Sequence, residues 1–167
     1  NIGGPATFDN AGTFRKSGGT GTTSITAAFN NNGSLTVQAG TVNLAAGGDS
    51  HGSFNAPLGG ALNFAGGTML LETNSTVTAA GTIGFSGGTV DVDGGYAVSG
   101  TTEINGGTAN FKSNASTVNA TLGSGVLSGS GVLVVSGTFN WTGGTMNGSG
   151  ATTIGSGGSL MISGAAT

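Results

Sequence analysis

Cysteine is missing from this chain of 167 residues, and charged side chains are scarce. Without cysteine the chain can form neither disulfides nor thiolate metal sites. Lys and Arg together number three and Asp and Glu six, which gives a net charge of -3. The basic residues Arg15, Lys16 and Lys112 are too few for a nucleic-acid footprint, so we expect no nucleic-acid partner.

Proline and long apolar runs are also rare. The chain has two prolines and lacks the glycine at every third position that a collagen triple helix requires. Its longest apolar run is Val132–Val135. A membrane span needs about 20 apolar residues, so we expect neither a signal peptide nor membrane insertion. The sequence begins with Asn1 rather than Met, as a processed product or an excised segment would.

Glycine is abundant by contrast, with 37 residues, far above an average usage of roughly 7%. Glycine costs about 1 kcal/mol per residue in a helix interior, and no segment shows the apolar spacing of an amphipathic helix. Disorder normally goes with high net charge and few branched apolar residues, whereas Val, Leu, Ile and Phe recur steadily here. The composition therefore predicts an ordered, repetitive, all-β chain.

The tripeptide Gly-Gly-Thr recurs along the chain. It begins at Gly18, Gly66, Gly87, Gly106 and Gly143. The period is about 20 where the repeat is clean. The long step from Gly18 to Gly66 requires an insertion or a degenerate copy, and we expect the fold to bulge there. Because glycine accepts positive φ, we expect each copy to mark one corner of the repeat and the start of the following strand.

A second pattern alternates polar and apolar residues with a period of two. It reads Thr, apolar, Asn or Asp, apolar at residues 41–44, 89–92, 108–111 and 138–141, with a variant at 61–64. Such alternation is typical of a strand with one buried face, and it places the apolar side chains inward. The expected inward side chains include Leu44, Phe64, Phe85, Val92, Ile104, Phe111, Val135, Trp141 and Ile154.

Between these copies the chain divides into short pieces, each ending on an apolar residue before a Gly, Ser or Asn turn. Three pieces fill one period, which predicts a right-handed parallel β-helix (β-solenoid) with three short strands per coil of about 20 residues. We expect residues 1–167 to form this single domain, or a segment of a longer solenoid, with roughly eight coils. A sandwich of hairpins would also suit the Gly dipeptides, but its strands would not repeat one sequence at every third strand.

Most of the chain, from about Ala11 to Ser163, resembles the Gly-, Thr- and Asn-rich repeats of large bacterial surface proteins, the hemagglutinin-like and autotransporter-like adhesins. The resemblance rests on the runs GTVNLAAGG, ALNFAGGT, GGTVDV, GGTANF and TLGSGVLSGSGVLVVSGTFNWTGGTM. It implies a β-solenoid passenger region and an extracellular or cell-surface location. It implies no catalytic residues.

Few side chains could carry chemistry. Asp91 and Asp93 share the outward face of a predicted strand and are a calcium candidate, although calcium normally takes more than two carboxylates. His51, the single histidine, has only Asp49 nearby, too few ligands for zinc. Residues 84–88 match G-x-S-x-G, but the helix that a nucleophile elbow requires does not follow. We expect no enzyme and no cofactor; a β-helix polysaccharide lyase is the least favoured alternative.

The outward rows and the two ends are the remaining candidates for binding. Rows of Thr and Asn, about 4.8 Å apart from coil to coil, could match a glycan or ice, although their spacing shows that they cannot all lie on one face. Neither end resembles a polar cap, so the terminal coils near Phe8, Phe14, Leu160 and Ile162 are the expected self-association sites. The sequence predicts an extracellular rod, either an adhesin stalk flanked by further coils or a self-stacking filament subunit. The alternative is a carbohydrate- or ice-binding module.

Overall fold

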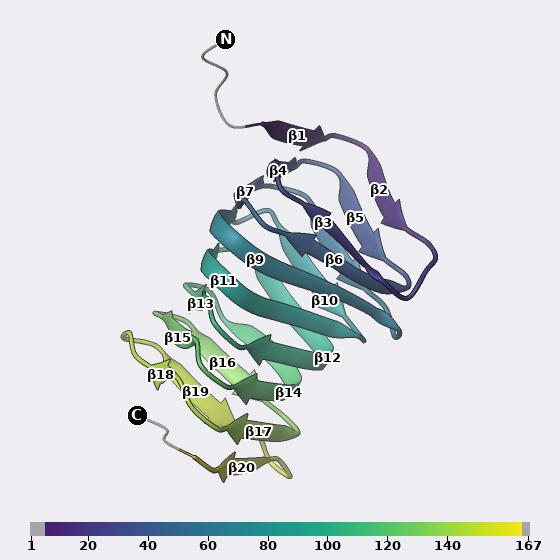
Figure 1. Ribbon diagram of the computed structural model, residues 1–167. Coiled ribbons are helices and arrows are strands. Elements are labelled where there is room, and N and C mark those ends of the chain that lie inside the picture. Colours follow the sequence, from purple (N-terminus) through teal and green to yellow (C-terminus); the bar gives the residue numbers. More distant parts are fainter. Residues whose placement is uncertain (1–5, 165–167) are drawn as a thin grey trace.

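The computed structural model describes residues 6–164, which form β-strands joined by turns (Figure 1). All strand pairings in this part of the chain are parallel. The chain winds in a right-handed sense from one end of the stack to the other (Figure 1). Residues 6–164 contain no helix long and apolar enough to cross a membrane. The protein is therefore a parallel β-solenoid.

Three columns of strands form the walls of the solenoid. The first column stacks β1 (Thr7–Asn10), β4 (Ala28–Asn31), β7 (Gly48–Ser50), the end of β9 (Gly60–Leu71), the end of β11 (Thr82–Val92), β13 (Thr108–Phe111), β15 (Val126–Gly129) and β18 (Thr145–Met146). The second column stacks β2 (Thr13–Lys16), β5 (Ser34–Val37), β8 (Ser53–Ala56), β10 (Thr76–Ala79), the beginning of β12 (Gly95–Ile104), the beginning of β14 (Ala115–Leu122), β16 (Val132–Val135) and β19 (Ala151–Ile154). The third column stacks β3 (Thr22–Ile25), β6 (Gly40–Leu44), the beginnings of β9 and β11, the ends of β12 and β14, β17 (Thr138–Trp141) and β20 (Ser159–Ile162).

Each column holds one strand, or one part of a long strand, from each coil, so the three strands per coil predicted from the sequence are confirmed. The length of a coil varies within narrow limits. The coil that leads from Phe111 to its partner Gly129 is shorter than the coil that leads from Phe54 to its partner Val77. With a spacing of about 4.8 Å between strands, the eight coils extend over roughly 40 Å.

Gly-Gly-Thr marks the corner between the third and first columns in four of its five copies. In three of these the second glycine, Gly67, Gly88 or Gly144, has a φ of 70°, 69° or 72°, which glycine adopts without a steric penalty. The copy at Gly18 instead precedes β3, at the corner between the second and third columns, so the prediction of one shared corner is wrong for this copy. Its different corner explains the long step in the sequence between Gly18 and Gly66.

Between Gly18 and Gly66 the third column shows no bulge, whereas in the first column β4 and β7 pair only at Asn31 and Ser50. In the third column β3 pairs with β6, and β6 with β9, in continuous register. Degenerate sequences, residues 26–27 and 46–47, lead into β4 and β7 at the corner that Gly-Gly-Thr occupies in later coils. Register shifts occur farther along, where β11 pairs with β9 and β12 with β14.

Apolar side chains from all three columns fill the interior. Seven of the nine predicted inward side chains are at most 1% exposed. The other two, Trp141 and Ile154, are partly buried against the core because they lie in the last two coils of the stack. The largest fully buried side chains are six phenylalanines, namely Phe29, Phe54, Phe64, Phe85, Phe111 and Phe139.

Polar side chains replace apolar ones at one inward position of the first column near the N-terminal end. Asn10 Nδ2 donates to Asn31 Oδ1 at 2.8 Å, and Asn31 Nδ2 donates to the Ser53 carbonyl at 3.1 Å. In the next coil the Ser50 hydroxyl donates to the Asn31 carbonyl at 3.0 Å. Because every one of these buried groups has a partner, the polar stack holds successive corners together without a desolvation penalty.

A second buried polar group lies deeper in the stack, around Tyr96 at the start of β12. Thr102 Oγ1 donates to Thr117 Oγ1 at 3.0 Å, and Thr117 Oγ1 donates to the Asn119 carbonyl at 2.8 Å. The Tyr96 hydroxyl, 2.8 Å from Thr102 Oγ1, is therefore the donor of that pair. Each hydroxyl donates once, so the chain of bonds is complete. Burial raises the pKa of Tyr96 well above its usual value.

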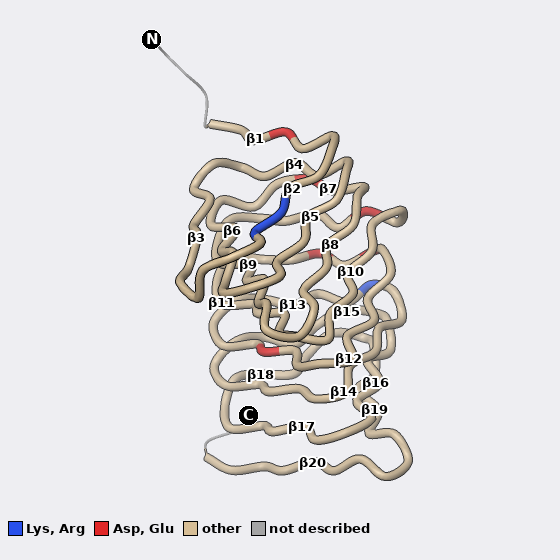
Figure 2. Tube along the Cα trace, turned by 90° about the vertical axis from the view of Figure 1, so that its right-hand side faces the viewer, with Lys and Arg blue, Asp and Glu red and all other residues tan. Residues whose placement is uncertain are grey.

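Charged residues stop two thirds of the way along the chain. Lys112 is the last of them, and residues 113–167 contain neither acid nor base. Figure 2 shows the resulting asymmetry, with uncharged tube along β16, β17, β19 and β20. The outward surface of the last coils is therefore uncharged.

Candidate functional site

The predicted calcium candidate is part of an ion-pair cluster. Lys112 Nζ lies 3.1 Å from Asp91 Oδ2 and 3.6 Å from Asp93 Oδ1. Asn110 Nδ2 donates to Asp91 Oδ1 at 2.6 Å. The hydrogen bond to Asp91 raises the pKa of Lys112, which keeps the ammonium charged. The geometry favours an internal ion pair, with Lys112 in the position where a cation would contact both carboxylates.

Residues 6–164 contain no cluster of three or more His, Cys, Asp and Glu side chains that could hold a metal ion. Lys112 was overlooked in the sequence because it lies about one coil beyond both carboxylates. Side chains separated by one coil become neighbours when parallel strands stack. A search for oppositely charged residues about one repeat period apart in the sequence would have found the pair.

His51 and Ser86, the other residues considered for chemistry, lie at different corners of the solenoid. His51 is exposed in the turn between β7 and β8. Ser86 lies within β11 and accepts a hydrogen bond from Asn63 Nδ2 at 2.8 Å. Strand β11 continues past Ser86 to Val92, so the strand-to-helix turn of a nucleophile elbow does not form at this serine.

The outward Thr and Asn rows are divided between two faces, as their spacing predicts. The copies at residues 89–92 and 108–111 lie in the first column, and those at 41–44, 61–64 and 138–141 lie in the third. Amide side chains bond along both ladders. In the first column Asn30 Nδ2 donates to Asp9 Oδ1 at 2.7 Å, and in the third Asn63 Nδ2 donates to Asn43 Oδ1 at 3.2 Å.

The outward side of the third column, here called the third-column face, presents two parallel rows of side chains. The first row follows the strand pairing through Thr22, Thr41, Ala61, Thr82, Thr101, Asn119, Thr138 and Ser159. The second row follows it through Ser24, Asn43, Asn63, Gly84, Glu103, Thr121, Asn140 and Met161. The strict Thr-x-Thr pattern expected of an ice-binding face is therefore not present on this face.

Two hollows open on the third-column face where small residues interrupt the rows. One, of about 410 Å³, lies around Ala61 and reaches Thr101 and the turn at Leu58. The other, of about 210 Å³, lies around Gly84 and reaches Glu103. Both are lined by Thr41, Ala61 and Thr82. The two hollows therefore adjoin along these shared residues, and together we call them the Ala61 groove.

Polar side chains line one half of the Ala61 groove and an apolar side chain lines the other. Asn63 Oδ1 lies 2.6 Å from the point where a Cβ of residue 84 would stand. This oxygen therefore occupies the space beside Gly84 that a side chain would otherwise fill. Asn105 Nδ2 lies 3.5 Å from Glu103 Oε2. At the opposite end Leu58 is 85% exposed.

The sequence predicts the Thr and Asn rows but not this groove. Ala61 interrupts the first row and Gly84 the second, at positions that look unrelated in the sequence. They belong to successive coils of the third column because Ala61 pairs with Thr82 and Asn63 with Gly84. A gap in either row alone is unremarkable, and only the register of β9 with β11 joins the two gaps.

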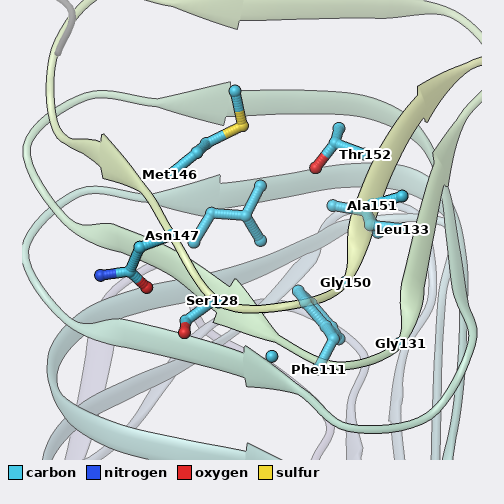
Figure 3. Close-up of a pocket in the computed structure, with 12 residues that line it drawn as sticks. Phe111, Ser128, Gly131, Leu133, Met146, Asn147, Gly150, Ala151 and Thr152 are labelled. Carbon is cyan, nitrogen blue, oxygen red and sulfur yellow. The ribbon is translucent and has the colours of Figure 1, made fainter.

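A third hollow, of about 270 Å³, lies near the C-terminal end of the stack and is surrounded by Phe111, Leu133 and Met146 (Figure 3). Gly129 and Gly148 follow Phe111 at the same position of the first column. The space that the Phe111 ring fills in its own coil is therefore left empty in the next two coils. The hollow is a gap in the apolar core, and none of the described residues that line it is charged.

The predicted self-association residues lie at the two ends of the stack. Phe8 is 43% exposed and stacks on Phe29 with ring centroids 5.3 Å apart. Phe14 is partly buried against the core. At the other end Leu160 and Ile162 are 45% and 59% exposed. The first and last described coils thus present apolar side chains that the inner coils bury.

Comparisons of the chain with protein-family models, with curated proteins and with solved structures found no match. The stacked coils agree with the repeat fold that the resemblance to bacterial surface proteins implies. The relation to adhesins stays a prediction.

Proposed function

We propose that this chain is a structural rod, a β-solenoid segment of an extracellular or cell-surface protein that extends by stacking on further coils. One observation carries the proposal: three parallel ladders run from the first described coil to the last around one apolar core. Such a stack joins each coil to the next by backbone hydrogen bonds in every wall. Its outward surface is polar with few charges, as expected of a spacer that has no strongly charged partner.

The terminal coils supply the contact by which the rod would extend. A parallel strand at the end of a stack has unpaired backbone groups on one side, which favour pairing with another strand. Phe8 at one end and Ile162 at the other add apolar surface to that contact. A second copy stacked end to end would continue the ladders and cover both side chains.

Sedimentation velocity and electron microscopy of the purified chain at rising concentration test the rod and its stacking. We expect rods that lengthen in increments of roughly 40 Å, the length of eight coils. Phe8→Lys or Ile162→Lys should stop the growth, because each buries an unpaired charge in the contact. Val134→Lys is the control, since Val134 is 37% exposed on the side of β16. Discrete particles at the highest soluble concentration would exclude self-stacking.

A further inference from the structure

We propose that the Ala61 groove binds a neutral oligosaccharide. The groove lies on the side of the solenoid, away from the end coils, so this inference is independent of the stacking proposed above. It follows four successive strands of the third column, β6, β9, β11 and β12. With about 4.8 Å between strands it extends over about 14 Å along the axis, which suits a short chain of sugar rings lying across the strands.

The polar half of the groove offers the hydrogen-bonding groups that sugar hydroxyls need. Thr41, Thr82 and Ser86 present hydroxyls, which both donate and accept, and the Asn105 amide does the same with separate atoms. The Glu103 carboxylate accepts only, and its two oxygens can take bonds from neighbouring hydroxyls of one sugar ring. A polyhydroxylated ligand could therefore satisfy all of these groups at once.

The apolar end of the groove suits the other surface of a sugar ring. Leu58 has the highest exposure, 85%, of the large apolar side chains that the structure describes as exposed. It lies in the turn before β9, where Gly59 has a φ of 93° and Gly60 N donates to the Pro57 carbonyl at 2.9 Å. This tight turn holds Leu58 at the rim of the larger hollow. A pyranose ring has an apolar C–H face that could cover Leu58 while its hydroxyls reach the threonine row.

Charge and backbone pairing argue against other ligand classes. Among the described residues that line the groove, Glu103 alone is charged. Its carboxylate would repel uronic acids, sulfated sugars and nucleic acids. A peptide that adds as a strand needs a free sheet edge. Here β9 and β11 are paired on both sides with other strands of the third column, so their backbone offers no such edge.

Ala61→Thr provides a sharp test because it fills the groove without removing a polar group. Threonine at residue 61 would restore the row between Thr41 and Thr82, and it is favoured in strands. The fold should therefore be kept. The matched control is Ala28→Thr in β4 of the first column, where Ala28 pairs with Thr7. Leu58→Ser tests the apolar end of the groove.

The measurement is isothermal titration calorimetry of the purified chain with hexasaccharides of glucose, mannose, galactose and N-acetylglucosamine. Polygalacturonate, heparin and an unstructured peptide serve as competing classes. We expect at least one neutral hexasaccharide to bind. Ala61→Thr should weaken the affinity for this sugar about tenfold or more, because the displaced sugar loses one to two hydrogen bonds. Leu58→Ser should weaken the affinity less. Ala28→Thr should bind as the unmodified chain does.

Three results would overturn the proposal. They are no binding of any neutral sugar at millimolar concentration, equal binding by the Ala61→Thr and Ala28→Thr variants, and preferential binding of an acidic polymer or of the peptide. Each leaves the rod proposal standing, because stacking is measured by imaging and sedimentation in the absence of sugar. Failure of the chain to stack would likewise leave the groove untouched.

Discussion

Replacing Thr102 with Val should destabilise the solenoid through the hydroxyl of Tyr96, which it leaves without an acceptor. Thr102 is fully buried and Tyr96 is 3% exposed, so water cannot replace the lost partner. A buried polar group that loses its partner costs about 1–3 kcal/mol. Val has nearly the shape of Thr, so no large cavity contributes. We expect Thr102→Val to lower the free energy of unfolding by about 1–3 kcal/mol.

Replacing Tyr96 with Phe should lower the stability of the unmodified chain but raise that of the Thr102→Val variant. Tyr96→Phe alone removes the donor at the head of the chain of hydroxyls, and Thr102 keeps its own donation to Thr117, so the cost is about 1 kcal/mol. In the double variant both partners are apolar, and no hydroxyl of this pair is left unpaired. We therefore expect Tyr96→Phe/Thr102→Val to be more stable than Thr102→Val alone.

Urea unfolding followed by circular dichroism measures this cycle, and fluorescence of Trp141 checks that the coils unfold together. Cooperative unfolding matters because repeat stacks can lose coils one at a time. The reasoning is refuted if Thr102→Val unfolds at the urea concentration of the unmodified chain. It is also refuted if adding Tyr96→Phe to that variant lowers its stability further.

Two other predictions concern Tyr96 and the glycine column. Burial raises the pKa of Tyr96 in the folded state, so the stability that this group contributes is complete below a pH of about 10 and falls as the pH rises, by up to about 1.4 kcal/mol per pH unit. Absorbance at alkaline pH should show that the tyrosine ionises together with unfolding. Ionisation of the tyrosine in the intact fold would contradict this prediction. Gly129→Ala should lower the unfolding free energy by about 1–3 kcal/mol, since its φ of 125° disfavours a side chain and a Cβ would meet the Phe111 carbonyl oxygen. Gly12→Ala, where a Cβ would meet no atom within 4 Å, is the control, and equal urea midpoints for the two variants would contradict the explanation.

Ala61 and Lys112 show how far the candidate sites could be predicted. The rows that border the groove follow from alternation within single strands, so the sequence indicates a polar outward face. The groove needs Ala61 and Gly84 to lie in adjacent coils. The ion pair likewise needs Lys112 to meet Asp91 and Asp93 from one coil away. Both depend on the length of each coil, which differs from one coil to the next.

The parallel β-solenoid, its three strands per coil and most of its core follow from the sequence by itself. Alternation with a period of two identifies the inward side chains of each strand locally, and seven of the nine inward side chains predicted from the sequence are buried. Which strands share a column is decided only by the tertiary structure. The Gly-Gly-Thr copy at Gly18 lies at a different corner from the other four because strand stacking, and not the turn sequence, sets the column. That stacking also produces the adjoining hollows of the Ala61 groove, the Lys112 ion pair and the chain of hydroxyls from Tyr96.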